Sequence, residues 1–235
     1  MDSAVDMLFR PVRAGNAFEE TVERLLQSIR LGVVRAGERL PPERELAERL
    51  GVSRVTLREA IRALADAGYV ESRRGRYGGT FVKETLPASP GGDGRSFDVE
   101  SLEDVLSLRY VLETGAAELA AKRGLPAAER AHLRDRLAEA SAAGLDDYRR
   151  RDSRLHLAVA EATGSASLTS AVADVRTAVN RFLDRIPLLE RNLEHSNDQH
   201  ERLVAAILAG DVAAARQAMA EHLDGTASLL RAFLS

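Results

Sequence analysis

The chain of 235 residues contains no Cys and no Trp, and only four Tyr and six Phe. Without thiols, disulfides, thiolate metal sites and cysteine nucleophiles are excluded, so a transition-metal site would have to use His and carboxylate ligands. The sequence also lacks an apolar run of the roughly 18 residues needed to cross a bilayer. Its first residues are acidic where a signal peptide would carry a basic segment. We therefore expect a cytoplasmic protein that does not associate with membranes.

The chain also has no excess of positive charge, because it contains 33 Lys and Arg and 36 Asp and Glu, which gives a net charge of −3. The charges are unevenly distributed, however. Residues 1–85 hold 15 basic and 13 acidic side chains, and the rest of the chain holds 18 basic and 23 acidic ones. Since nucleic-acid binding depends on local basic patches, the net charge does not exclude it.

A stretch rich in Pro and Gly, residues 86–98, separates two parts of different character and is typical of a linker. We expect a winged helix-turn-helix DNA-binding domain at residues 1–85 and an all-α effector-binding and dimerisation domain at 99–235. Helical patterns in the second part cover residues 101–122, 127–142, 145–163, 167–186, 196–209 and 212–233. With so few aromatics, its core must be Leu, Val and Ala. The expected fold is mainly α, with a C-terminal antiparallel helical bundle.

Residues 41–67 have the pattern of two short helices joined by a tight turn. Gly51 supplies the left-handed residue that ends the first helix, and Ser53 caps the second. In the second helix Arg54, Thr56 and Arg58 project from the first turns, where a recognition helix contacts base edges. The apolar positions that we expect to face inward are Leu46, Ala47 and Leu50, then Val55, Leu57, Ile61 and Leu64.

The segment ESRRGRYGG, residues 71–79, is rich in Arg and Gly and lies between two short apolar stretches, which predicts a hairpin wing. Arg54 and Arg58 could instead belong to an ordinary solvated helix face. The order of cap, turn, recognition helix and basic wing favours DNA binding.

The motifs L-P-x-E-R-x-L-A, G-V-S-R-x-T-L-R-E-A and G-x-x-G-G-T-F-V, within residues 18–83, resemble the GntR family of bacterial transcription regulators. The resemblance implies that DNA is contacted by Arg44, Arg54, Thr56, Arg58 and the wing residue Gly75, with Ser53 helping as a cap or phosphate ligand. The wing is longer than the common G-x-G form of the family.

The five His residues sort by helical spacing. His132 and His195 have charged and polar neighbours and are expected to be solvated, whereas the other three share faces with apolar residues. Asp152 and His156 are one helical turn apart, so they could bind one metal ion, with His200 and His222 completing the shell from two other helices. The alternative is that each is a hydrogen-bonded core histidine. A site of three imidazoles and one carboxylate suits Zn, Ni or Mn.

Three further stretches, L-R-x-x-L-E-x-x-A-A-x-L-A-A from Leu108, D-S-R-L-H from Asp152 and QHERLVAAILAGD with AARQAMAEHL, resemble the all-helical effector domain of the FadR subgroup. In metal-binding members the ligands occupy the positions of Asp152, His156, His200 and His222, so the resemblance implies a divalent metal here.

Arg109 lies on a face that otherwise consists of core residues, and a buried guanidinium needs a partner. One interpretation is a pair with Glu113, one turn further on. The other is that Arg109 binds the carboxylate of a small metabolite next to the open metal positions, an arrangement similar to that inferred for the family.

The sequence therefore predicts a non-enzymatic transcription regulator, expected to be a repressor. A homodimer would read an inverted-repeat operator in double-stranded DNA, and the metal and a small carboxylate would modulate that binding. Two alternatives remain: a metal-responsive sensor without an organic effector, and a metal-dependent hydrolase fused to a DNA-binding domain.

Overall fold

A computed structural model of the chain describes residues 11–12, 14–30, 33–75, 78–87 and 99–234. The chain divides into two compact units, which we describe separately. Unit 1 comprises Met1–Phe97 together with Gly225–Ser235, and unit 2 comprises Asp98–Asp224. The linker predicted at residues 86–98 lies mostly outside the described residues, and so do Arg76 and Tyr77 of the predicted wing.

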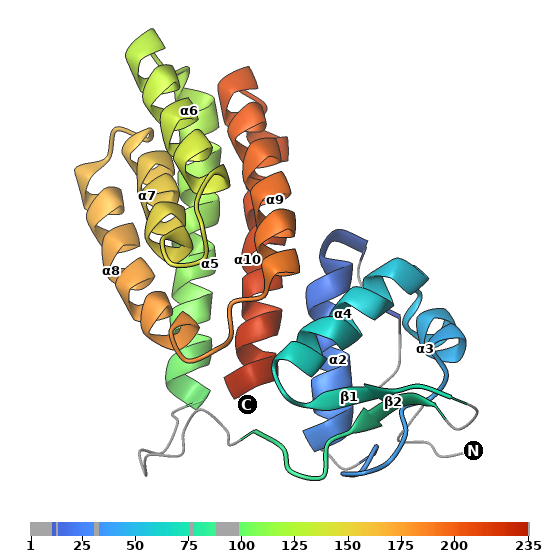
Figure 1. Cartoon of the computed structure of the whole chain (residues 1–235). Helices are drawn as coiled ribbons and strands as arrows, with labels where there is room; N and C mark the ends of the chain where they lie inside the picture. The colour runs from blue at the N-terminus through green and yellow to red at the C-terminus, as the bar shows by residue number, and fades with distance from the viewer. Residues whose placement is uncertain (1–10, 13, 31–32, 76–77, 88–98, 235) are drawn as a thin grey trace. The chain divides into compact units, whose positions relative to one another are not determined.

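Unit 1 is a winged helix-turn-helix, as predicted (Figure 1). Gly51 ends α3 with a left-handed φ of 65°, which a residue with a side chain adopts only at a cost. The backbone N–H of Thr56 donates to Ser53 Oγ at 3.0 Å, so Ser53 is the N-cap that the sequence indicates. The elements of unit 1 are η1 (Ala14–Asn16), α2 (Ala17–Arg30), α3 (Glu43–Leu50), α4 (Arg54–Asp66), β1 (Val70–Arg73) and β2 (Gly79–Val82).

The predicted inner faces of α3 and α4 are buried, with one exception. Leu46, Leu50 and Leu57 are fully buried, and α4 packs against both α2 and α3. Val55, in contrast, is 62% exposed. The prediction for Val55 was wrong because its position in the first turn of α4 places it on the same outer surface as Arg54 and Arg58.

The wing is a two-stranded antiparallel sheet in which Val70 pairs with Val82 and Arg73 with Gly79. Val70 and Val82 point inward to the core, while Ser72 and Arg73 are exposed. Arg39, from the segment before α3, forms a β-bridge with Phe81. The wing is thereby joined to the chain that leads into the helix-turn-helix.

Unit 2 is built from helices, with a core of Ala, Leu and Val as predicted. The helix α5 packs against α7, α8 and α9, and α6 packs against α7 and α9 (Figure 1). None of the described helices is long and apolar enough to span a membrane. The helices are α5 (Val99–Arg123), α6 (Ala127–Ser141), α7 (Tyr148–Glu161), α8 (Ala166–Leu183), α9 (Glu190–Ala209) and α10 (Val212–Leu234).

The helix α9 begins at Glu190, six residues before the predicted start at Ser196. Ser196 is not a cap but a buried residue whose hydroxyl lies 3.4 Å from His222 Nδ1. The sequence could not show the earlier start of α9. A Ser that caps a helix cannot be distinguished in the sequence from a buried Ser whose partner is on another helix.

The last eleven residues of the chain belong to unit 1, whereas the domain boundaries from sequence placed all of 99–235 together. In unit 1 the Arg30 guanidinium donates to the carbonyl of Phe233 at 2.8 Å and to that of Ala232. The ring of Phe233 packs edge-on against Tyr69, with 6.1 Å between centroids. The two hydrogen bonds from Arg30 satisfy two of the carbonyls that lack partners within the helix at the end of α10.

Candidate functional site

The predicted DNA-contacting residues lie on exposed positions of unit 1. Arg54 and Arg58 extend from the first turns of α4, and Thr56 lies between them, half-buried. Arg44 is exposed on α3, and Gly75 is exposed at the wing with a φ of 107°. An Arg side chain can make a bidentate contact with guanine in the major groove, so Arg54 and Arg58 have the chemistry that base recognition needs.

Arg58 is already held in place in the free protein. Its Nε donates to Glu43 Oε2 at 2.8 Å, across the turn between α3 and α4, and the two side chains are 65% and 41% exposed. Such an exposed pair contributes about 0–1 kcal/mol to stability. The pair therefore contributes little to the stability of the fold, and in the absence of DNA it holds the Arg58 guanidinium against Glu43 of α3.

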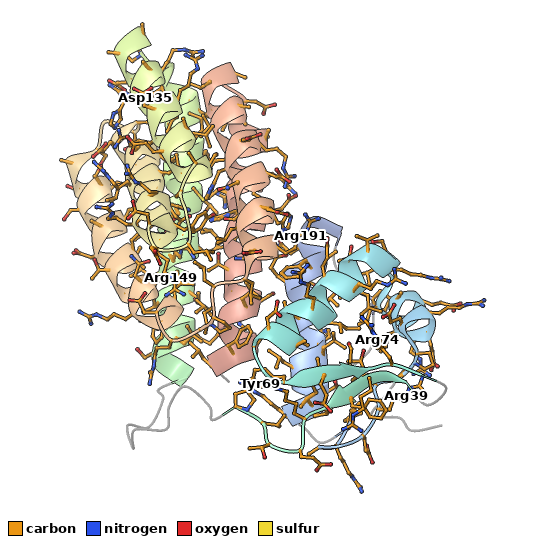
Figure 2. The ribbon with its side chains drawn as sticks, viewed as in Figure 1. Arg39, Tyr69, Arg74, Asp135, Arg149 and Arg191 are labelled. Carbon is orange, nitrogen blue, oxygen red and sulfur yellow. The ribbon has the colours of Figure 1, made fainter. Side chains whose placement is uncertain are left out.

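Sequence reasoning missed two features of this surface. Val55 offers an exposed apolar group beside the two arginines, the kind of side chain that contacts a thymine methyl. A cavity of about 390 Å³ lies between the wing strands and the segment before α3, and it is lined in part by Arg39, Arg73 and Glu43. Arg74 extends from the end of β1, and Arg39 lies beside β2 (Figure 2).

In unit 2 the four predicted metal ligands come together. Asp152, His156, His200 and His222 are all buried, and each offers one ligand atom such that the four atoms lie within 4.8 Å of one another. The two Nε2 atoms of His156 and His222 are 3.2 Å apart, and Asp152 Oδ1 lies 3.3 Å from His200 Nε2. Ligand atoms bonded at about 2.0–2.1 Å to one tetrahedral ion would be separated by about 3.3 Å, so these spacings fit a metal centre.

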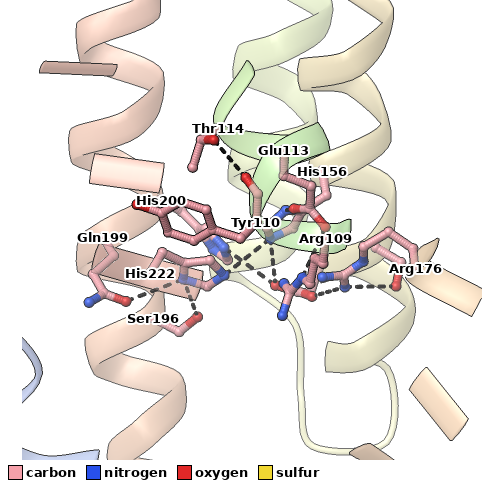
Figure 3. A network of polar contacts seen from close by, with 12 residues as sticks. Arg109, Tyr110, Glu113, Thr114, His156, Arg176, Ser196, Gln199, His200 and His222 are labelled. Atoms are coloured by element: carbon pink, nitrogen blue, oxygen red, sulfur yellow. Dashed lines mark hydrogen bonds and ion pairs between the residues drawn. The ribbon is translucent and has the colours of Figure 1, made fainter. Parts of the chain in front are cut away.

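Two of the imidazoles are oriented by residues behind them (Figure 3). His156 Nδ1 pairs with Glu113 Oε2, and His222 Nδ1 lies 3.2 Å from Gln199 Oε1. If Nδ1 donates to these oxygens, Nε2 of each ring is left as the electron-pair donor that faces the cluster. Metal-binding histidines are held in this way by carboxylate and carbonyl acceptors.

His200 differs because it is fully buried and, among the described residues, neither of its ring nitrogens has a hydrogen-bond partner. Nε2 is within ion-pair distance of Asp152 but does not meet the geometry of a hydrogen bond. Leaving a polar nitrogen buried without a partner costs about 1–3 kcal/mol. A metal ion bound at Nε2 would remove this cost for that nitrogen, so the orphaned ring supports the metal interpretation over a hydrogen-bonded core histidine.

The electrostatics also suit a cation. Burial lowers the pKa of His200 to about 3 and the pKa of His222 well below its ordinary value, so both rings are neutral at pH 7. Burial alone would raise the pKa of Asp152, but Arg176 and His156 beside it bring that pKa well below its usual range. Neutral imidazoles and an ionised carboxylate are the protonation states that bind a metal.

The other two histidines are outside the cluster. His132 is 51% exposed and lies near Glu161 on the surface, as predicted, while His195 is half-buried.

Arg109 pairs with Glu113, which is one of the two interpretations of this arginine given above. Its Nε donates to Glu113 Oε1 at 3.0 Å, and the two side chains are only 2% and 1% exposed. Glu113 thus bridges Arg109 and His156. The pair leaves part of the guanidinium unused, because Arg109 Nη1 is buried and has no hydrogen-bond partner within the described ranges.

Arg176 on α8 was missed. It is 2% exposed, and its Nη2 donates to Asp152 Oδ2 and to Ser153 Oγ, the latter at 3.0 Å. The signal was present in the sequence, since Arg176 follows Val172 and Val175 and precedes Val179 on one apolar face of a helix. The same reasoning that singled out Arg109 would have found it.

Both units thus define a class of protein: a winged helix-turn-helix DNA reader joined to a helical domain with a buried polar centre. Residues 18–82 match the family described as bacterial regulatory proteins, gntR family, and residues 104–225 match the FCD domain. The chain belongs to the GntR family of transcription regulators and carries an FCD domain.

Curated relatives agree with this assignment. The chain is 32% identical to the Uxu operon transcriptional regulator of Escherichia coli K12, over 84% of this chain and 80% of that protein. It is 29% identical to the HTH-type transcriptional regulator LutR of Bacillus subtilis 168, over 87% of this chain and 97% of that protein. These relatives are transcription regulators and not enzymes, so the hydrolase alternative is not supported.

Among solved structures, the chain is similar to Escherichia coli McbR/YncC, with a TM-score of 0.51 and 22% identity over 91% of this chain and 96% of that one. This likeness concerns the fold alone.

Proposed function

We propose that this regulator binds a divalent metal ion through Asp152, His156, His200 and His222, and that a small carboxylate bound next to the metal changes its affinity for DNA. The observation that carries the proposal is the buried His200, which lies beside three other potential ligands and whose ring nitrogens find no hydrogen-bond partner among the residues that the structure describes. Three imidazoles and one carboxylate favour Zn, Ni or Mn and leave one or two positions for another ligand.

When bound, the metal would supply a positive centre that attracts a carboxylate oxygen. Arg109 would bind the same carboxylate through its free Nη1, which is buried next to the cluster. Glu113 serves both groups, since it pairs with Arg109 and orients His156. A change at the effector would therefore be transmitted to the metal ligands through one side chain.

On the DNA side we propose a cytoplasmic repressor that acts as a homodimer and reads an inverted repeat, with Arg54, Thr56 and Arg58 in the major groove. Ser53, Arg44 and Gly75 contact the backbone from the cap, α3 and the wing. Effector binding lowers DNA occupancy only to the extent that the effector prefers the non-binding conformation.

The experiment that tests this function is a gel shift with the operator selected from random DNA. DNA binding is compared for protein with metal, with chelator, and with metal plus each acid of a carboxylate panel. We expect at least one acid to change binding only when the metal is present. A response to metal alone, with no effect of any acid, would instead identify a metal sensor without an organic effector.

The ligand set is tested separately by metal analysis of purified wild type and His200→Ala. We expect stoichiometric metal in the wild type and its loss in the variant. His132→Ala, which removes an exposed histidine, is the matched control and retains the metal. Equal metal content in wild type and His200→Ala would refute the assignment.

A further inference from the structure

The centre of unit 2 contains two buried guanidinium groups whose hydrogen-bonding capacity is only partly used. In the part of the chain that the structure describes, Arg109 Nη1 and the Nε and Nη1 atoms of Arg176 are buried without a hydrogen-bond partner. Both side chains are only 2% exposed and reach the same cluster, beside the histidines (Figure 3). Native proteins rarely leave buried donors of charged groups unsatisfied, because each costs more than a neutral one.

The balance of charges around the cluster also indicates that this site could bind an anion. Arg109 and Arg176 are balanced by Glu113 and Asp152, each cation being paired with one carboxylate. These four residues are therefore neutral together, and the three histidines are neutral when they bind a metal. A divalent metal then adds two positive charges that no side chain of this cluster compensates. Uncompensated charge in a buried site is costly, so a bound anion with two negative charges would balance it.

We propose that the effector is a dianion, specifically a small dicarboxylate, and that Arg176 binds its second carboxylate. This inference rests on the proposed function and specifies the ligand of that site. One carboxylate of the ligand would bind the metal and accept a hydrogen bond from Arg109. The other carboxylate would accept hydrogen bonds from Nε and Nη1 of Arg176. A guanidinium has five N–H donors in a planar fork, so Arg176 can hold Asp152 through Nη2 and a ligand through Nε and Nη1.

Arg176 then has two roles that can be separated. Its Nη2 holds Asp152 Oδ2, which leaves Oδ1 of the same carboxylate directed to His200 and His156. Its other N–H groups select the effector. Loss of the first role lowers metal affinity, and loss of the second lowers the preference for dicarboxylates over monocarboxylates.

The test uses the full chain loaded with Zn²⁺ and matched pairs of acids that differ by one carboxylate: acetate and malonate, propionate and succinate, lactate and malate. Binding is measured by isothermal titration calorimetry, with the metal content determined before and after. We expect at least one dicarboxylate to bind about tenfold or more tightly than its monocarboxylate partner, since one additional charge-assisted contact is worth about 1.4 kcal/mol or more.

The variant Arg176→Gln removes the charge, and we expect the advantage of the dicarboxylate over its matched monocarboxylate to fall below about twofold when the variant and the wild type are compared at equal zinc content. Arg181→Gln, which removes an exposed arginine of the same helix, leaves the advantage unchanged. If Arg176→Gln does not fold or does not hold zinc, Arg176→Lys takes its place. Its ammonium can pair with Asp152 but offers no planar fork to a second carboxylate, so we expect the same fall in the dicarboxylate advantage, and an unchanged advantage would overturn the role of Arg176. The wild-type comparison tests the dianion alone.

Equal affinity of each matched pair for the wild type would overturn the dianion and leave the proposed function intact. An unchanged dicarboxylate preference in Arg176→Gln would overturn the role of Arg176. If no acid of either class binds, the proposed carboxylate effector fails together with this inference.

Discussion

The two units of this protein use charged residues in opposite ways. In unit 1 the arginines proposed to contact DNA are exposed, and the side chain of Arg58 is 65% exposed even though it pairs with Glu43. In unit 2 the charged residues of the candidate site are almost completely buried, with Arg109 and Glu113 at 2% and 1% exposure. Exposed charges attract a long polyanion and are screened by salt, whereas buried charges bind a small ligand of defined shape. The difference explains how one chain with a net charge of −3 can contain both a DNA-binding domain and a candidate site for a small anion.

The largest expected effect follows from removing one member of a buried pair. Glu113→Gln leaves Arg109 as an uncompensated buried cation, and breaking such a pair costs about 3–5 kcal/mol. We expect this loss in the free energy of unfolding of the metal-free protein, measured by urea titration with hydrogen exchange resolved to α5 and α7.

The control for Glu113→Gln is Asp66→Asn, which removes the acid of the exposed pair with Arg62 in unit 1. An exposed pair of this kind contributes about 0–1 kcal/mol. If both variants cost the same, the contrast between buried and exposed charge would not hold for this protein.

The next effect concerns Arg54 and Arg58. Each substitution to Ala is expected to cost about 1–3 kcal/mol of affinity for the operator relative to mixed-sequence DNA, because each removes a potential bidentate base contact. Stability should stay within about 0.5 kcal/mol of wild type, since both side chains are exposed. Anisotropy titrations with selected operator and with mixed-sequence DNA provide the measurement. Full sequence discrimination by the double variant would disprove the recognition-helix assignment.

The salt dependence of ligand binding should also differ between the two units. Arg44→Ala removes a contact proposed to reach phosphate, so the slope of log affinity for DNA against log salt should fall by about one for each protomer bound. The loss should be similar for operator and mixed-sequence DNA. Carboxylate binding in unit 2 should change little over the same salt range, because buried charges are screened weakly. A carboxylate affinity that falls as steeply as DNA affinity would contradict the buried site.

Much of the fold and of the candidate site could be predicted from the sequence. The helix-turn-helix was predictable because its signals, Gly51 and Ser53, act on their immediate neighbours. The four histidine and aspartate positions of the cluster could be selected because helical spacing shows which side of a helix each residue occupies.

What could not be predicted depends on contacts between distant segments. The pairing of His156 with Glu113 joins α7 to α5, and the pairing of Arg176 with Asp152 joins α8 to α7. Spacing along one helix contains no information about which neighbouring helix supplies the partner. The end of α10 is a similar case, because the interaction of Arg30 with the Phe233 carbonyl spans 203 residues. Val55 is an error of a different kind. Its apolar side chain was assigned to the core, although surfaces that bind DNA also expose apolar groups.

The smallest expected effect concerns the pair between Glu43 and Arg58. Glu43→Gln keeps a hydrogen-bond acceptor for Arg58 but removes a negative charge that competes with DNA for the guanidinium. We expect DNA affinity to rise less than about fivefold at low salt, the gain of less than 1 kcal/mol typical of exposed charges, and to return to the wild-type value at high salt. Asp66→Asn makes the same change in net charge at the other end of α4, and it should produce a smaller gain. An equal gain in the two variants would mean that net charge alone is responsible. A decrease for Glu43→Gln would mean that the carboxylate positions Arg58 for DNA, in which case the exposed ion pairs of unit 1 are as specific in their geometry as the buried ones of unit 2.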